Sequence, residues 1–133
     1  MSERRSARVR ARVACLAAVV ALTGCDLGGP GGPARVAGTL TGNPATGAAV
    51  VEVTWPGVTG FEGRGGTQVY SGAVSGFPDR HRVILVDAAG GDLSFTIVLD
   101  DTRLDGPVLT VVSAVGTDNL PLDVTGLRVA LER

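Results

Sequence analysis

Apolar side chains recur at every second position over much of this chain, and that period limits what the chain can fold into. In residues 93–99, Leu, Phe, Ile and Leu alternate with Ser, Thr and Val. Residues 49–55 and 127–132 alternate in the same way. Successive side chains of a β-strand point to opposite faces, so a period of two predicts half-buried strands. No window of a dozen residues after residue 34 shows a helical stripe, and the predicted fold class is all-β.

Seven segments with this character predict seven strands, separated by clusters of Gly, Pro, Asn and Asp that favour turns. Seven short strands at this spacing are typical of a single antiparallel sandwich of two sheets. We expect Val83 and Leu85 to face the core with Phe95, and Ile84 and Val86 to face away from it. A strand that is apolar on both faces suits a central position in its sheet. The predicted strands are 35–41, 48–55, 67–75, 81–87, 92–99, 108–115 and 124–131.

The first 25 residues have the three parts of an export signal. Five arginines lie within residues 1–12, an apolar run follows at 13–22, and Leu-Thr-Gly-Cys occupies residues 22–25. The apolar run has about half the length that a helix needs to span a bilayer. This order resembles the signal peptide of bacterial lipoproteins. The resemblance implies a helical signal peptide at residues 1–24, cleavage before Cys25, and lipidation of Cys25 with a diacylglycerol and a further acyl chain such as palmitate.

The same resemblance implies a location, which is the extracytoplasmic side of the cell membrane, periplasmic or outer-surface. Residues 25–34 then comprise the lipidated cysteine and a Gly/Pro tether, which reaches about 30 Å when fully extended. A chain held by more than one acyl group stays attached to a bilayer. One alternative is an ordinary secretory leader with a chance cysteine. The pair Arg4-Arg5 raises the twin-arginine export route, but the polar residues after it favour the general secretory route.

Charge and cysteine content exclude several classes of function. Five of the twelve basic residues and one of the thirteen acidic residues lie in residues 1–24, so the rest of the chain has seven basic and twelve acidic groups, a net charge of −5. Nucleic acids and anionic lipid surfaces are bound by basic surfaces, so neither is an expected partner. Cys15 leaves with the leader and Cys25 is the lipid site. The predicted domain at residues 35–133 therefore has no disulfide and no thiol nucleophile.

Two short stretches carry a second resemblance. Residues 36–40 read Val-Ala-Gly-Thr-Leu and residues 47–50 read Gly-Ala-Ala-Val. Carboxypeptidase-regulatory-like and other immunoglobulin-like modules open in a similar way, with an extended strand, a Gly-rich turn and a Gly-Ala-x-Val strand. The resemblance implies an immunoglobulin-like sandwich.

His81 is the only histidine, so a catalytic or metal-binding role for it has little support from the sequence. Zinc and copper sites usually take several His or Cys ligands. A Ser-His-Asp triad has serines available, but the Gly-x-Ser-x-Gly pattern of a nucleophile elbow is absent from the sequence. Flanked by Arg80 and Arg82 at the start of a predicted strand, His81 is interpreted as a solvated edge residue.

Asp100, Asp101 and Asp105 form the densest acidic cluster of the sequence. The segment faintly resembles a calcium-binding loop, but side chains at two required positions carry no suitable oxygen, which excludes an EF-hand. A looser calcium site between sandwich loops, with Asp118 or Asp123 contributing, remains open. The other interpretation is a polar connection between two strands. No resident cofactor is expected.

The aromatic residues Trp55, Phe61, Tyr70 and Phe77 are the candidate binding residues. Trp55 ends a predicted strand, while Phe61 and Phe77 fall in predicted Gly-rich loops. Loop aromatics stack on sugar rings and anchor protein contacts. The other interpretation is that Trp55 and Tyr70 close the ends of the core.

Two classes of function follow. The favoured one is a non-catalytic, lipid-anchored β-sandwich of the cell envelope that binds a protein or glycan, or serves a structural role. The alternative is an envelope hydrolase or metal-dependent enzyme that uses His81 together with Asp100, Asp101 and Asp105.

Overall fold

The computed structural model describes residues 32–101 and 107–132, which contain strands and connecting turns and no helix. These residues therefore include no helix that is long and apolar enough to cross a membrane. The predicted signal peptide, Cys25 and Asp105 lie outside the described residues. The strands are β1 (Ala34–Thr41), β2 (Thr46–Thr54), β3 (Val58–Arg64), β4 (Gln68–Val74), β5 (Phe77–Val86), β6 (Ser94–Leu99), β7 (Val108–Gly116) and β8 (Arg128–Glu132).

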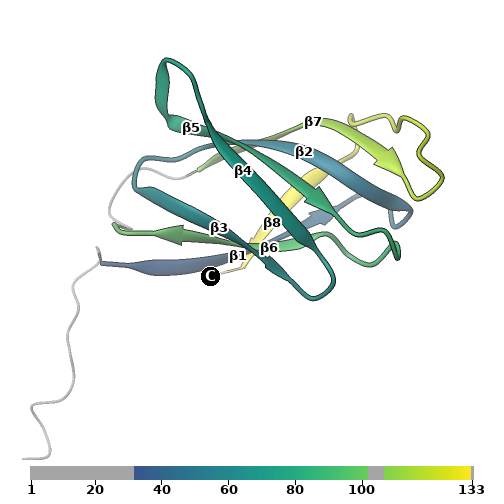
Figure 1. The fold of residues 1–133 in the computed structure, drawn as a ribbon, viewed down its shortest axis with the longest axis horizontal. Helices are drawn as coiled ribbons and strands as arrows, with labels where there is room; N and C mark the ends of the chain where they lie inside the picture. The colour runs from purple at the N-terminus through teal and green to yellow at the C-terminus, as the bar shows by residue number, and fades with distance from the viewer. Residues whose placement is uncertain (1–31, 102–106, 133) are drawn as a thin grey trace, which may run out of the picture.

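These strands form two sheets that pack face to face (Figure 1). Sheet A has the order β3-β6-β1-β8 and sheet B the order β4-β5-β2-β7. Every pairing within the two sheets is antiparallel. The all-β class and the two antiparallel sheets are therefore confirmed, with four described strands in each sheet.

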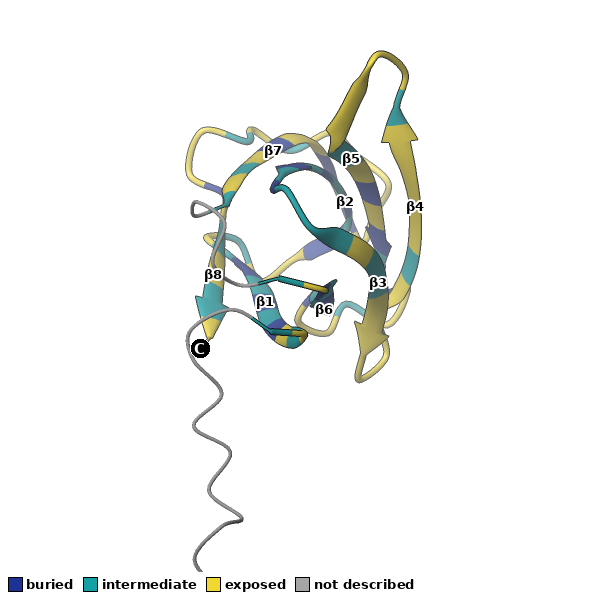
Figure 2. Cartoon of the chain, turned by 90° about the vertical axis from the view of Figure 1, so that its left-hand side faces the viewer, coloured by how far each residue is buried: buried dark blue, intermediate teal, exposed yellow. Residues whose placement is uncertain are grey.

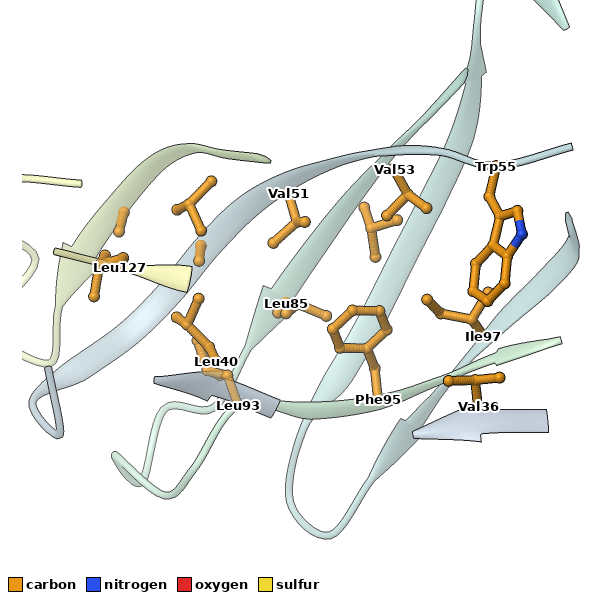
Figure 3. Close-up of a cluster of buried hydrophobic side chains, with 14 of the residues drawn as sticks. Val36, Leu40, Val51, Val53, Trp55, Leu85, Leu93, Phe95, Ile97 and Leu127 are labelled. Atoms are coloured by element: carbon orange, nitrogen blue, oxygen red, sulfur yellow. The ribbon is translucent and has the colours of Figure 1, made fainter. Parts of the chain in front are cut away.

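The core fills the space between the sheets (Figure 3). Phe95 enters it from β6, in sheet A, while Val83 and Leu85 enter it from β5, in sheet B, and all three side chains are completely buried. Ile84 lies exposed on the outer face of sheet B and Val86 is half-buried. The prediction that Val83, Leu85 and Phe95 face the core is confirmed. The predicted central position of β5, which lies between β4 and β2, is also confirmed.

One strand, β3, was not expected. The sequence predicted a connection between residues 55 and 67, because Gly60 and Gly63 interrupt the apolar alternation there. The segment is extended because it pairs with β6, where Phe61 lies opposite Ile97. At Gly63 the backbone approaches the Thr67 carbonyl so closely that a Cβ atom would collide with it. Glycine at residue 63 thus permits the tight passage from β3 into β4.

Two strand starts differ from the prediction by four residues, and the other boundaries of the predicted strands differ by two residues or fewer. The strand predicted at 81–87 begins at Phe77, because β4 and β5 continue as a hairpin that projects beyond the sandwich (Figures 1 and 2). Gly76 turns this hairpin with φ of 80°. The strand predicted at 124–131 begins at Arg128, because a turn precedes it in which the Leu127 N–H donates to the Val124 carbonyl at 3.0 Å.

Candidate functional site

The outer faces of the two sheets differ in the large apolar side chains that their described strands expose. Within the described residues, large exposed apolar side chains come from sheet B, with the exception of Leu120, which lies between β7 and β8. Sheet A exposes none of that size in its described strands. Contiguous apolar surface on one face of a small protein commonly marks an interaction site. The exposed apolar residues of sheet B are Tyr70, Phe77, Ile84, Val108 and Val112.

An apolar row crosses three strands of this face. Ile84 on β5 lies opposite Tyr70 on β4 and opposite Val50 on β2. Residues directly opposite one another in an antiparallel pair place their side chains on the same face of the sheet. Tyr70 is 59% exposed and Ile84 is 43% exposed, while Val50 is half-buried. We call Tyr70, Ile84 and Val50 the outer apolar row.

A charged cluster adjoins the outer apolar row. Glu52 on β2 lies opposite Arg82 on β5, and its carboxylate is 3.4 Å from the Nε of Arg80 and 3.7 Å from the Nε of Arg82. The Arg80 guanidinium carbon also lies 4.3 Å from the centroid of the Phe77 ring, a cation–π contact. Partly exposed ion pairs of this kind contribute at most about 1 kcal/mol, so the cluster mainly orients these side chains.

Sequence reasoning missed the charged cluster, since it depends on the register of β2 against β5. The sequence places Arg80 and Arg82 beside His81 but does not indicate that Glu52, on another strand, is their partner. The signal that was available is the two-residue spacing of the arginines, which places both on one face of a strand.

The four candidate aromatic residues do not form one binding surface. Trp55 is 5% exposed and closes one end of the core, near Ile97 and Val36 (Figure 3). Tyr70 does not close the core, because Val69 takes the inward position on β4 and leaves Tyr70 on the outer face. The expectation that Trp55 is a core residue is confirmed, and the same expectation for Tyr70 is wrong.

The two phenylalanines predicted in loops lie on strands. Phe77 is the first residue of β5 and remains exposed beside the hairpin turn. Phe61 is half-buried on β3, with its ring centroid 6.4 Å from that of Phe95 and 5.6 Å from that of His81. Phe61 therefore extends the core toward His81.

His81 is not a solvated edge residue. It lies on β5, a central strand, and is half-buried with its ring edge against the Phe61 ring at an interplanar angle of 64°. Groups of three or more His, Cys, Asp or Glu that could hold a metal ion are absent from residues 32–101 and 107–132. Among the described residues, His81 therefore packs as an aromatic side chain against Phe61.

The acidic candidates are only partly described. Asp100 follows β6 and is exposed, and its backbone N–H donates to the Gly57 carbonyl at 3.0 Å. Asp101 is half-buried, and Asp105 lies outside the described residues. The calcium hypothesis for Asp100, Asp101 and Asp105 therefore stays a prediction.

The further ligands considered for that calcium site lie elsewhere. Asp118 and Asp123 follow β7, at the end of the sandwich opposite to the end of β6. Asp118 Oδ1 accepts from the Leu120 N–H at 3.0 Å. Asp123 Oδ1 accepts from the Thr125 hydroxyl at 2.6 Å and from the Thr125 N–H at 2.9 Å. These contacts, the hydroxyl first, lower the pKa of Asp123.

Thr125→Val is expected to raise the pKa of Asp123 toward its ordinary value, because the hydroxyl donor is lost while the backbone donor remains. The lowered folded-state pKa stabilises the turn at neutral pH, and this contribution is lost as the pH falls through that pKa. An NMR titration of the side-chain carboxyl carbons measures the shift, with Asp118 as an internal control. An unchanged Asp123 titration would show that the hydroxyl has no part in it.

A half-open pocket of about 230 Å³ lies between the β1–β2 turn and the start of β6. It is lined by residues 39–44, Thr46 and residues 91–93. Pockets that enclose small-molecule ligands usually measure about 300–1,000 Å³ and are largely apolar. This pocket is smaller than that range and none of the three residues of the outer apolar row lines it, so the open face of sheet B is the better candidate site.

Comparisons of the chain with protein-family models, with curated proteins and with solved structures found no match. The features of the chain that bear on function are therefore the outer face of sheet B and the lipoprotein-like motif at residues 22–25.

Proposed function

We propose that this protein is a lipid-anchored, non-catalytic β-sandwich of the cell envelope that binds another envelope protein through the outer face of sheet B. The observation that carries the binding function is that, among the described strands, large exposed apolar side chains are confined to that sheet. The motif at residues 22–25 supports the anchor and the extracytoplasmic location. An immunoglobulin-like character is part of the proposal, and the two four-stranded antiparallel sheets around one core support it.

A protein is a better match for this face than a glycan. Sugar rings stack on flat aromatic side chains and need polar groups around them, whereas Ile84 and Val50 offer aliphatic surface. Apolar centres with a polar rim are typical of protein interfaces, and here Arg82 and Glu52 flank the outer apolar row. A glycan is the second candidate, because Tyr70 presents an exposed ring whose hydroxyl contacts Gln68 Oε1 at 3.3 Å.

The alternative enzyme gains no support from the described residues. His81 packs against Phe61, and Asp100 makes its described hydrogen bond through its backbone N–H. A hydrolase or metal enzyme needs a second reactive group beside the histidine. The non-catalytic function is therefore the one that we propose.

Ile84→Arg is expected to abolish partner binding, because it places a charge at the centre of the outer apolar row while leaving the core intact. Affinity capture from detergent-solubilised envelopes, read by mass spectrometry, compares this variant with the native protein. Ala130→Arg is the matched control, since Ala130 is an exposed strand residue of sheet A. A partner that is captured equally by all three proteins would contradict binding through sheet B.

A further inference from the structure

In the part of the chain that the structure describes, the edge of sheet B formed by β4 is unprotected. β4 pairs only with β5, and among the described strands none lies beyond it (Figure 2). Its sequence is Gln-Val-Tyr-Ser-Gly-Ala-Val, seven residues without a charge or a proline. The register is regular until its last step, between Ala73 and Val74. Free backbone N–H and C=O groups on a regular edge of this kind are a template for another strand.

The other three sheet edges carry the features that usually block strand addition. β3 has charged residues and a register shift between Val58 and Gly60. β8 has only five residues and is charged at both ends. β7 has two register shifts against β2, and residues 120–122 hydrogen-bond to its free side. Protection of three edges makes the exposed fourth edge a specific feature of the molecule.

We infer that β4 binds the β4 strand of a second copy of this chain, antiparallel and in register about Ser71. In such a pair, residue 71 lies opposite its own symmetry mate, and both copies contribute the same patch. Symmetric pairing brings identical residues together near the axis, so a charged edge would repel itself. β4 meets this requirement, because it has no charge although the chain after residue 24 carries a net charge of −5.

The side chains of β4 are complementary to themselves in this register. Tyr70 of one copy lies opposite Gly72 of the other, at two symmetric positions. Nothing in the described structure lies within 4 Å of the site where a Cβ atom of Gly72 would stand. The exposed Tyr70 ring can therefore cover the glycine of the neighbouring strand, an arrangement that compensates for the missing side chain. It also joins the two outer apolar rows across the new sheet.

The symmetry of the pair agrees with attachment of both copies to one bilayer. The two-fold axis stands perpendicular to sheet B, so sheet A of both copies lies on the same side. β1, into which the tether leads, belongs to sheet A. Each tether spans at most about 30 Å, and both start from the same layer. Only this agreement rests on the proposed anchor, whereas the pairing of β4 does not.

Ser71→Cys in the full-length protein tests the register. Opposite residues of an antiparallel pair have Cα atoms about 4.5–5.5 Å apart, which a disulfide can bridge. After mild oxidation in detergent, we expect a disulfide-linked species of twice the apparent mass. Ser113→Cys is the matched control, because Ser113 is an exposed strand residue of the same sheet far from the β4 edge. Native protein measures any background from Cys25.

Ser71→Lys tests the pairing without a crosslink. Two lysines facing each other at the axis are expected to convert the dimer to a monomer in light scattering, whereas Ser113→Lys stays dimeric. The inference is overturned if the native protein is monomeric, or if Ser71→Cys crosslinks no more than Ser113→Cys. It is also overturned if Ser71→Cys links to a different protein, since the edge then binds another chain. Because the native protein and all four variants carry the same Cys25, the comparisons among them separate a failure of the β4 pairing from a failure of the proposed anchor.

Discussion

Replacing Trp55 with alanine is expected to lower the free energy of unfolding by about 3–5 kcal/mol, the usual cost of removing a large aromatic side chain from a core. The indole is 5% exposed and closes one end of the apolar cluster. Because a domain of this size is typically stable by only about 5–15 kcal/mol, the loss is a large fraction of the total. Trp55 is the only tryptophan, so unfolding in urea is followed by far-ultraviolet circular dichroism rather than by fluorescence.

Two further variants make this result specific. Tyr70→Ala is the matched aromatic control, and we expect a change of less than about 0.5 kcal/mol because the ring is mostly exposed. Trp55→Phe is expected to cost less than Trp55→Ala, since a ring remains and the indole Nε1 has no hydrogen-bond partner among the described residues. A Trp55→Ala variant with native stability would contradict a core role and would return Trp55 to the candidate binding residues.

Replacing Cys25 with alanine is expected to move the protein from the detergent phase to the aqueous phase. Acyl chains hold a protein at a bilayer by about 0.8 kcal/mol for each buried methylene group, so two or more chains dominate its partitioning. The described domain offers no apolar helix that could replace them. Phase separation of cell extracts, read with an antibody, measures the shift.

Cys15→Ala is the matched control for the anchor. It removes the other cysteine, which lies in the predicted leader, and it is expected to leave the partitioning unchanged. Unchanged detergent partitioning of Cys25→Ala would contradict lipidation at this residue. A shift in both variants would indicate that export, rather than lipid attachment, had been disturbed.

The sequence predicts which side chains of a strand face the core when one of the two alternating sets of residues is clearly apolar. Phe95 faces the core as the sequence predicts, and Ile97, Val51 and Val53, which belong to the apolar phase of their strands, are buried there too. On β4 the two neighbours Val69 and Tyr70 are both apolar, so the pattern does not determine which one faces inward. Tertiary packing selects the smaller valine, and the tyrosine becomes part of the exposed face.

Strand β3 and the charged cluster were beyond prediction for a different reason. β3 contains glycines and half-exposed positions, and its extended conformation depends on a ladder with β6, some 35 residues away along the chain. The contacts of Glu52 with Arg80 and Arg82 depend on the register between β2 and β5. In both cases the pairing strand lies far away in the sequence. The periodicity of a single segment therefore cannot predict which strand it pairs with.

The strand order also dictates when the molecule can be completed. β1 is the first strand, yet its two neighbours in sheet A are β6 and β8, both from the second half of the chain. β2 similarly waits for β5 and β7 in sheet B. Pairing between distant segments is slow, because a long loop must close before any contact forms. Neither sheet can therefore be finished until nearly the whole chain is available, an order of events compatible with the export that we propose.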